Sequence, residues 1–178
     1  MDWQTFCMDR RWEALHVGCC NRSELTVCFS SEFNRKACPS TDAAIEEKWQ
    51  TLVSGNQRLF NGQKFRLNSI RRLSGRGDTP RVSLELGLTD YKTAMCTNHN
   101  EDQMSLEILW NHGLEAYSNK QACFADPIAV NVVLTTRDEK IVLIRRADWV
   151  GEAKGLLDVP GGHAEPQVTF LTLIIRQR

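Results

Sequence analysis

The interpretation of this chain depends on one stretch near its C-terminal end, Leu156-Leu157-Asp158-Val159-Pro160-Gly161-Gly162-His163-Ala164-Glu165-Pro166-Gln167. The apolar residues up to Val159 predict a strand that enters a Pro-Gly-Gly turn. Glycines allow close approach to a ligand and positive φ angles, and successive N–H groups in such a turn can form an anion-binding nest. Asp158, His163 and Glu165 add side chains suited to phosphate, hydroxyl or metal. The alternative is a strand-ending turn without a ligand.

Two apolar segments precede this stretch and predict a β-hairpin. Ile128–Leu134 and Ile141–Ile144 are separated by the polar turn 137–140. Both segments are apolar along their whole length, which is typical of strands covered on both faces. Arg145 and Arg146 follow the second strand, and a loop from 147 to 155 leads into the stretch 156–167.

The N-terminal part of the chain predicts strands and helices in mixed order. Val82, Leu84, Leu86 and Leu88 alternate with smaller or polar residues, which indicates a half-buried strand. Shorter strands are expected at 25–29 and 64–67. Helical spacing of apolar residues predicts a helix from Ser40 or Thr41 to Gly55 and another over 102–110, closed by Gly113.

The composition is that of a globular protein without a strong charge bias. The 178 residues are 42% hydrophobic and 25% charged, and 22 Lys plus Arg balance 22 Asp plus Glu. This balance gives no reason to expect nucleic-acid or membrane-surface binding, and neither a secretory signal nor a membrane-spanning stretch is expected. Seven cysteines without a C-x-x-C pair favour a reducing, intracellular setting, cytoplasmic or nuclear.

The segment Gly155–Pro166 resembles the entry to the Nudix box of Nudix hydrolases. Its His-x-Glu-Pro continuation, His163 to Pro166, resembles the branch that cleaves UDP-glucose and UDP-galactose. The resemblance runs, with gaps, from about Thr41 to Gln167. It implies an α/β fold, a Nudix-type α/β/α sandwich that is incomplete at the C-terminus, with an N-terminal helix-and-strand accessory layer. The expected division is a poorly structured segment 1–24, an accessory region 25–124, the first part of the Nudix domain 125–167 and a non-family tail 168–178.

The resemblance also implies a chemistry, namely Mg²⁺-dependent hydrolysis of UDP-sugars to UMP and sugar 1-phosphate. It implies uridine-facing aromatic contacts from Phe60 and Tyr91, although both could equally be ordinary half-buried aromatic residues. By the same resemblance Arg146 faces the diphosphate and Gly151 offers a backbone contact. The remaining residues expected to reach the sugar and phosphates are Asp158, His163 and Glu165.

The sequence departs from the family where the Nudix box should continue. If Gly162 is the first box position, the first Glu position is occupied by Val168, and no Glu-Glu pair follows Glu165. The box helix normally places carboxylates on one face to hold Mg²⁺, so no catalytic or metal-binding residue is assigned and Mg²⁺ binding by this chain is doubtful. We interpret residues 168–178 as the tail of a truncated isoform and expect no activity. The alternatives are a catalytically dead UDP-sugar-binding or regulatory fragment and a chain that does not fold stably.

Overall fold

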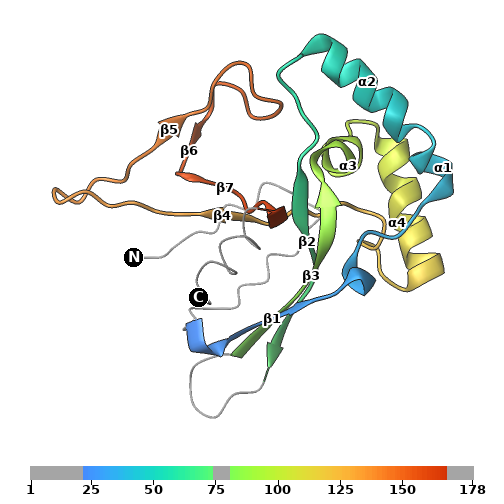
Figure 1. Cartoon of the computed structure of the whole chain (residues 1–178), viewed down its shortest axis with the longest axis horizontal. Coiled ribbons are helices and arrows are strands. Elements are labelled where there is room, and N and C mark those ends of the chain that lie inside the picture. The colour runs from blue at the N-terminus through green and yellow to red at the C-terminus, as the bar shows by residue number, and fades with distance from the viewer. Residues whose placement is uncertain (1–21, 74–80, 168–178) are drawn as a thin grey trace.

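A three-stranded sheet forms the centre of the molecule in the computed structural model, which describes residues 22–73 and 81–167 (Figure 1). The strand order is β1 (Leu25–Phe29), β3 (Arg81–Asp90), β2 (Gln63–Leu73). β1 runs parallel to β3, and β2 runs antiparallel to it with a register shift between Leu67 and Ser69. The strands predicted at 25–29 and 82–88 are confirmed, and β2 is longer than the predicted 64–67.

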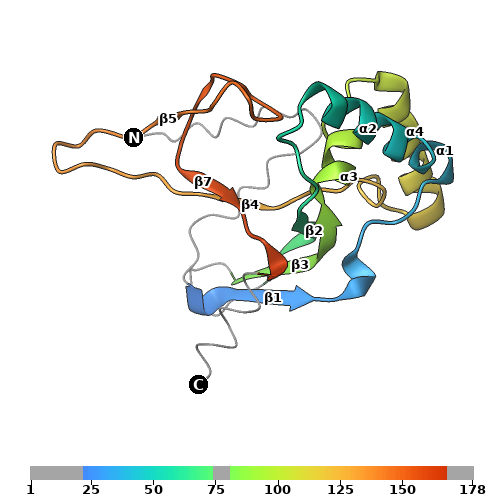
Figure 2. The ribbon, with the colours of Figure 1, turned by 45° about the horizontal axis from the view of Figure 1, so that its top comes forward.

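The helices gather at one end of this sheet, as Figures 1 and 2 show. Short 3-10 turns occupy Arg22–Glu24 and Ser31–Phe33. The predicted helix from Ser40 is in fact split into α1 (Pro39–Asp42) and α2 (Ile45–Gly55). α1 begins at proline, whose fixed φ and missing N–H suit the first turn of a helix. The short helix α3 (Tyr91–Cys96) follows β3 directly and was not predicted.

Helix α4 (Gln103–Tyr117) begins as predicted and ends later than predicted. The Asp102 side chain accepts a hydrogen bond from the Met104 N–H and caps the first turn. The helix continues through Gly113 because a glycine inside a helix costs only about 1 kcal/mol relative to alanine. It ends where Ser118 adopts φ 53°, the left-handed conformation typical of a helix terminus.

One cluster of buried side chains joins α1, α4 and the segment before β4. Its members are Cys38, Leu106, Leu109, Ala122, Cys123 and Phe124, with Trp110 packed against them. Burial raises the pKa of the Cys123 thiol to about 11, so this cysteine acts as a small apolar residue at neutral pH.

A buried guanidinium ties the sheet to this cluster. Arg66 on β2 is 1% exposed and donates to the carbonyls of Phe33, Gln121 and Phe124 at 2.9, 2.7 and 3.0 Å. Its Nη2 lies 3.7 Å from Oδ2 of the buried Asp126. Desolvation lowers the pKa of Arg66, and the Asp126 carboxylate opposes this effect. The contacts fix segment 121–126 against β2, where the chain then enters its C-terminal part.

The C-terminal part contains two small antiparallel pairs, and the predicted hairpin is retained only at its turn. β4 (Ala129–Asn131) pairs with β7 (Gly161–His163), and β5 (Ile144–Arg145) pairs with β6 (Leu157–Asp158). The expected pairing of the two apolar segments survives only in the Thr135–Ile141 bridge and a few flanking bonds. Among the described residues, segment 128–144 lacks the cover on both faces that its apolar sequence suits. The backbone forms an extended arm here (Figure 1). The apolar side chains are 46–61% exposed at Val130, Val132, Val133, Leu134, Ile141, Leu143 and Ile144.

The predicted Pro-Gly-Gly turn is wrong as well. Gly161 and Gly162 are extended residues of β7, and Gly155 is the glycine with positive φ among the described residues. A Cβ atom on Gly161 would lie 2.1 Å from Oδ1 of Asn131 and 2.6 Å from the Val130 carbonyl. The glycine is needed because two strands approach closely here, so the predicted anion-binding nest is replaced by strand pairing.

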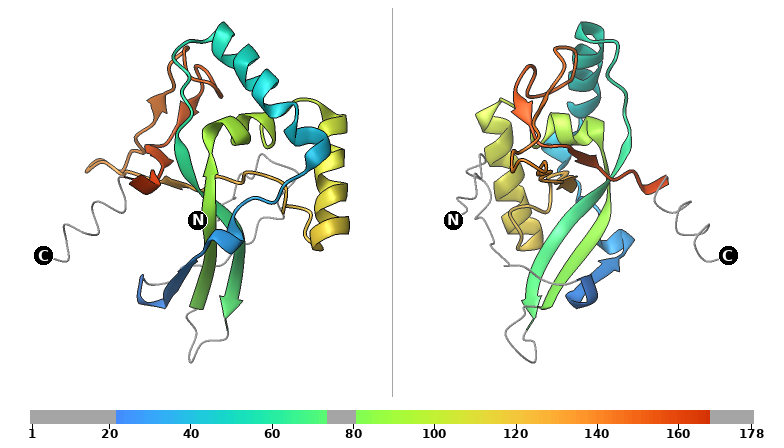
Figure 3. Two further views of the ribbon diagram at one scale, coloured as in Figure 1. Left: turned by 45° about the vertical axis from the view of Figure 1, so that its right-hand side comes forward. Right: turned by 90° about the vertical axis from the view of Figure 1, so that its left-hand side faces the viewer.

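Figure 3 shows the C-terminal pairs lying beside the upper part of β2, next to α2 and α3. The chain crosses over at residues 126–128, where Leu67 N–H donates to Asp126 O and Ile128 N–H donates to Phe65 O, both at 2.9 Å. No helix among the described residues has the length and apolar content required to cross a bilayer. The expectations for most of 1–24 and for the tail 168–178 lie outside the described residues.

Candidate functional site

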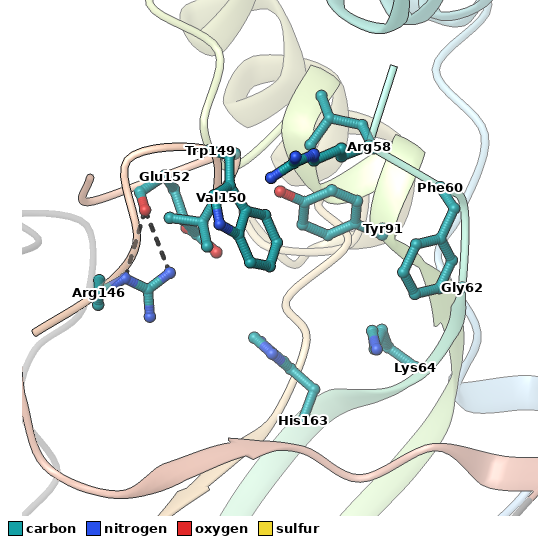
Figure 4. Close-up of a pocket in the computed structure, with 12 residues that line it drawn as sticks. Arg58, Phe60, Gly62, Lys64, Tyr91, Arg146, Trp149, Val150, Glu152 and His163 are labelled. Atoms are coloured by element: carbon teal, nitrogen blue, oxygen red, sulfur yellow. Dashed lines mark hydrogen bonds between the residues drawn. The ribbon is translucent and has the colours of Figure 1, made fainter. Parts of the chain in front are cut away.

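A pocket of about 230 Å³ lies where the connection between α2 and β2 faces the loop 147–155 (Figure 4). We call residues 147–155 the pocket loop. The start of α3 and the end of β7 complete the walls. The lining residues are Arg58, Leu59, Phe60, Gly62, Lys64, Tyr91, Arg146, Trp149, Val150, Gly151, Glu152 and His163.

One side of the pocket is aromatic. Trp149 and Phe60 lie on either side of Tyr91 in Figure 4. Phe60 is 71% exposed and Trp149 is 54% exposed, whereas Tyr91 is partly buried. The Tyr91 ring packs edge-on against Trp49, with the two ring centroids 6.1 Å apart. Burial, assisted by the nearby Glu152, raises the pKa of the Tyr91 hydroxyl, so it remains protonated and can donate a hydrogen bond.

The opposite side carries cations. Arg146 donates from Nε and Nη2 to the Glu152 carbonyl at 3.3 and 3.1 Å and from Nη1 to Asp158 Oδ2 at 3.2 Å. Lys64 Nζ pairs with Glu165 Oε1 at 3.5 Å. Burial, and next the positive charge of Lys64, lowers the pKa of His163, so its imidazole is neutral at pH 7.

The pocket loop is pinned at its base. Arg146 N–H donates to the Leu156 carbonyl at 2.9 Å, and Gly155 N–H donates to the Arg146 carbonyl at 3.1 Å. Ala153 and Gly155 have φ angles of 50° and 68°, which turn the chain back on itself. The loop therefore presents residues 149–152 to the pocket from a fixed base.

Gly151 is required by a close approach within the pocket. A Cβ atom at this position would lie 2.1 Å from Oη of Tyr91 and 3.2 Å from Cδ2 of Leu59. Because the tyrosine ring is rigid, a larger residue would displace either the ring or the loop. This is a physical reason for glycine beyond the backbone contact implied by the sequence resemblance.

The structure brings the seven predicted site residues into one neighbourhood. Phe60, Tyr91, Arg146, Gly151 and His163 line the pocket. Asp158 and Glu165 reach it indirectly, through their ion pairs with Arg146 and Lys64.

Sequence reasoning missed seven lining residues, of which four have charged or aromatic side chains, namely Arg58, Lys64, Trp149 and Glu152. Lys64 was visible as part of a predicted strand, and Trp149 as a large aromatic residue within a predicted loop. Neither pattern carries information about which distant segment lies opposite, so neither could be assigned to the site.

Comparison with characterised proteins identifies the relatives of this chain, although no family model matches it. It is 37% identical over 151 residues to uridine diphosphate glucose pyrophosphatase NUDT22 of Mus musculus, covering 85% of this chain and 48% of the relative. The Homo sapiens protein of that name is 39% identical over 148 residues, covering 82% and 47%. Nudix hydrolase 9 of Arabidopsis thaliana is 37% identical over 152 residues, covering 81% and 47%.

The chain is a Nudix homologue. The predicted resemblance to this family and to its UDP-glucose pyrophosphatases is thereby confirmed. The homologue spans about half the length of these curated relatives.

The described residues of this Nudix homologue do not fit a Mg²⁺ site. Among residues 22–73 and 81–167, no group of three or more His, Cys, Asp or Glu side chains could hold a metal ion. The carboxylates near the pocket face basic side chains: Asp158 faces Arg146, Glu165 faces Lys64, and Glu152 Oε2 lies 3.0 Å from His99 Nε2. Mg²⁺ needs several oxygen ligands in a compact octahedron, and these paired carboxylates are dispersed around the pocket.

A second cavity, of about 620 Å³, lies on the α2 and α3 side of Gly151. Its charged lining residues are Glu47, Lys48 and Glu101, and His99 also lines it. Charges of both signs are mixed there, so the lining does not select an anionic or a cationic ligand.

Proposed function

We propose that this chain recognises a UDP-sugar through its nucleoside diphosphate part, which binds in the pocket beneath the pocket loop. The observation that carries the proposal is the arrangement of aromatic rings on one side of the cavity and of two cations, Arg146 and Lys64, with the neutral His163 on the other (Figure 4). A nucleotide offers a planar base next to a polyanion, and this chemistry matches the two sides. The names of the relatives, as uridine diphosphate glucose pyrophosphatases, support uridine as the nucleoside.

Each proposed contact follows from the chemistry of the side chain. The exposed ring of Phe60 and the ring of Tyr91 suit stacking on a base, since every base has a π-face. Arg146 is held in a fixed orientation by Glu152 and Asp158, which limits the entropy lost when it binds a phosphate group. His163 is neutral in the free pocket, and proton uptake beside a phosphate would add a positive charge.

The cavity volume limits what the pocket can enclose. A volume of about 230 Å³ is below the roughly 300–1,000 Å³ of pockets that bury whole drug-sized ligands. We therefore propose that the base and the first phosphate occupy the pocket while the sugar lies outside it, toward Asp158 and Glu165. These two residues sit beside the cationic side through their ion pairs.

We also propose the domain division and the finer fold given by the sequence. In this proposal 25–124 is the accessory region, 125–167 is the first part of a Nudix α/β/α sandwich, and 1–24 and 168–178 lie outside both. The exposed apolar arm of residues 130–144 supports an incomplete sandwich, because strands of that kind are normally covered. An intracellular, reducing setting fits the free thiols of Cys28, Cys38, Cys96 and Cys123.

Hydrolysis of a UDP-sugar to UMP and sugar 1-phosphate requires water to attack the diphosphate and Mg²⁺ to neutralise the developing charge. We propose that the 178 residues supply nucleotide recognition and lack the carboxylates for the metal. Residues 168–178 contain no Asp or Glu. The alternative of a binding or regulatory fragment without catalysis is favoured by the same dispersed, cation-paired carboxylates.

Titration calorimetry with UDP tests the recognition. The wild-type chain should bind UDP, and Tyr91→Ala and Arg146→Ala should weaken binding by about tenfold or more, as expected for loss of a stacking or charge-assisted contact. Matched controls are Tyr117→Ala on α4 and Arg71→Ala on β2, which do not line the pocket and should leave the affinity unchanged. Equal affinity in all five proteins would refute the proposal.

An assay for the product sugar 1-phosphate separates binding from catalysis. The 178-residue chain with UDP-glucose and Mg²⁺ should release no sugar 1-phosphate above a blank. Turnover that EDTA abolishes would show that the chain builds a metal site from residues we have left unassigned.

A further inference from the structure

Trp149 lines the pocket but has no part in the nucleotide contacts proposed above. It lies in the pocket loop and is 54% exposed although it is the largest side chain there. A large aromatic ring beside a cavity, left half open to solvent, offers a surface that a planar ligand can cover.

Two contacts hold this exposed residue in position. The Arg58 guanidinium lies over the Trp149 ring, with Cζ 5.2 Å from the ring centroid. Asn56 donates from Nδ2 to the Trp149 carbonyl at 2.8 Å and accepts from the Arg58 N–H at 3.2 Å through Oδ1. One amide side chain therefore links the backbones of both partners, and the cation–π contact fixes the orientation of the ring.

The two exposed aromatic rings of the pocket lie on opposite sides of the partly buried Tyr91. Tyr91 is partly buried, with Trp49 edge-on against it and Gly151 close to its hydroxyl. The exposed rings are Phe60 and Trp149, and in Figure 4 they flank Tyr91 on opposite sides. A base placed over Tyr91 would thus be bounded by Phe60 at one side and by Trp149 at the other.

We propose that Trp149 is a stacking face for the nucleobase, held in place by Arg58, and that this pair sets the affinity of the pocket for the base. Arg58 covers one face of the ring and leaves the other for the ligand. Arg58 is in this view a positioning residue, since it acts through the tryptophan. The inference rests on the proposed function, because it assumes that the pocket takes a nucleotide.

Two probes distinguish stacking from a general effect on the loop: UDP, which carries a base, and inorganic pyrophosphate, which does not. Trp149→Ala should raise the Kd for UDP about 5- to 150-fold, the range for loss of one stacked aromatic. It should change the Kd for pyrophosphate by no more than about twofold, as for a surface substitution. Trp149→Phe should keep most of the UDP affinity and should lose the change in tryptophan fluorescence on binding.

A double-mutant cycle tests the role of Arg58. Arg58→Met should weaken UDP binding about 2- to 5-fold, as expected for an exposed cation–π contact. In the Trp149→Ala background the same substitution should have no further effect on UDP binding.

Each other outcome is informative. Unchanged UDP binding in Trp149→Ala, with UDP bound by the wild type, overturns this inference and leaves the proposed function standing. Equal losses for UDP and pyrophosphate also overturn it, because they show that the tryptophan only supports the loop. If the wild type binds neither UDP nor pyrophosphate, the proposed function itself fails and this inference falls with it.

Discussion

Replacing Arg66 by methionine should destabilise the protein strongly, because the guanidinium is the buried link between β2 and segment 121–126. Its three carbonyl partners lie at 2.7–3.0 Å, and Asn68 Oδ1 accepts a further bond at 3.0 Å. The side chains of Arg66 and Asp126 are 1% and 0% exposed. Methionine fills much of the same volume and removes every one of these bonds.

The expected loss of stability follows from the buried carboxylate and carbonyl groups that Arg66 contacts in the wild type. Removing one partner of a buried ion pair costs about 3–5 kcal/mol, since the remaining charge is uncompensated. Each abandoned carbonyl adds a desolvation penalty of about 1–3 kcal/mol unless water reaches it. These terms overlap, so we expect a loss of about 4 kcal/mol, a large part of the roughly 5–15 kcal/mol that stabilises a domain.

Urea denaturation at pH 7 measures this loss, with Arg71→Met as the matched control. Arg71 lies on the same strand and pairs with Glu85 at 3.0 Å, but its side chain is 65% exposed. An exposed pair contributes about 0–1 kcal/mol. For a typical m-value of about 2 kcal/mol per molar urea, the midpoint should fall by about 2 M in Arg66→Met and by at most about 0.5 M in the control.

Adding Asp126→Asn to Arg66→Met should restore part of the stability, because it removes the uncompensated carboxylate. The reasoning is refuted if Arg66→Met and Arg71→Met differ by less than about 1 kcal/mol with unchanged m-values, the scale of an ordinary surface substitution.

Four further outcomes are expected. Gly151→Val should abolish UDP binding measured by calorimetry, because its side chain would overlap the Tyr91 hydroxyl; retained affinity would mean that the loop shifts freely. In the folded protein the pKa of His163 is lowered from 6.5, so on acidification the unfolded chain binds a proton at this imidazole first. The contribution of His163 to stability is complete above pH 6.5 and is lost as the pH falls below it. His163→Gln should therefore flatten that part of the pH–stability profile. Conversely, UDP affinity should rise from pH 8 to 6 more steeply in the wild type than in His163→Gln, because bound phosphate favours the charged imidazole. The half-exposed side chains of the arm should bind a hydrophobic dye, and Val133→Lys with Ile141→Lys should reduce the fluorescence; an unchanged signal would place the dye elsewhere.

The sequence by itself determined the elements whose cause is local. The alternation from Val82 to Leu88 requires a strand with one buried face, and Val82 and Leu86 are indeed buried on β3. Asp102 marks the start of α4 because a cap satisfies N–H groups within the next turn. The residues around Gly155–Pro166 sufficed to identify the Nudix relatives, since that motif is contiguous in the chain.

Only the tertiary structure decided which segments meet. The apolar segments 128–134 and 141–144 each have strand propensity, but propensity does not choose a partner, and most of their ladder is formed with residues 157–163 instead. Gly161 and Gly162 suit a turn or a close strand contact equally well, and the approach of Asn131 selected the strand. Arg58 and Trp149 are 91 positions apart by their numbers (149 minus 58), and their contact arises because the pocket loop folds back over the connection between α2 and β2. Non-local contacts of this kind depend on the packing of the whole chain, which is why the place of Arg58 and Trp149 in the pocket could not be read from the sequence.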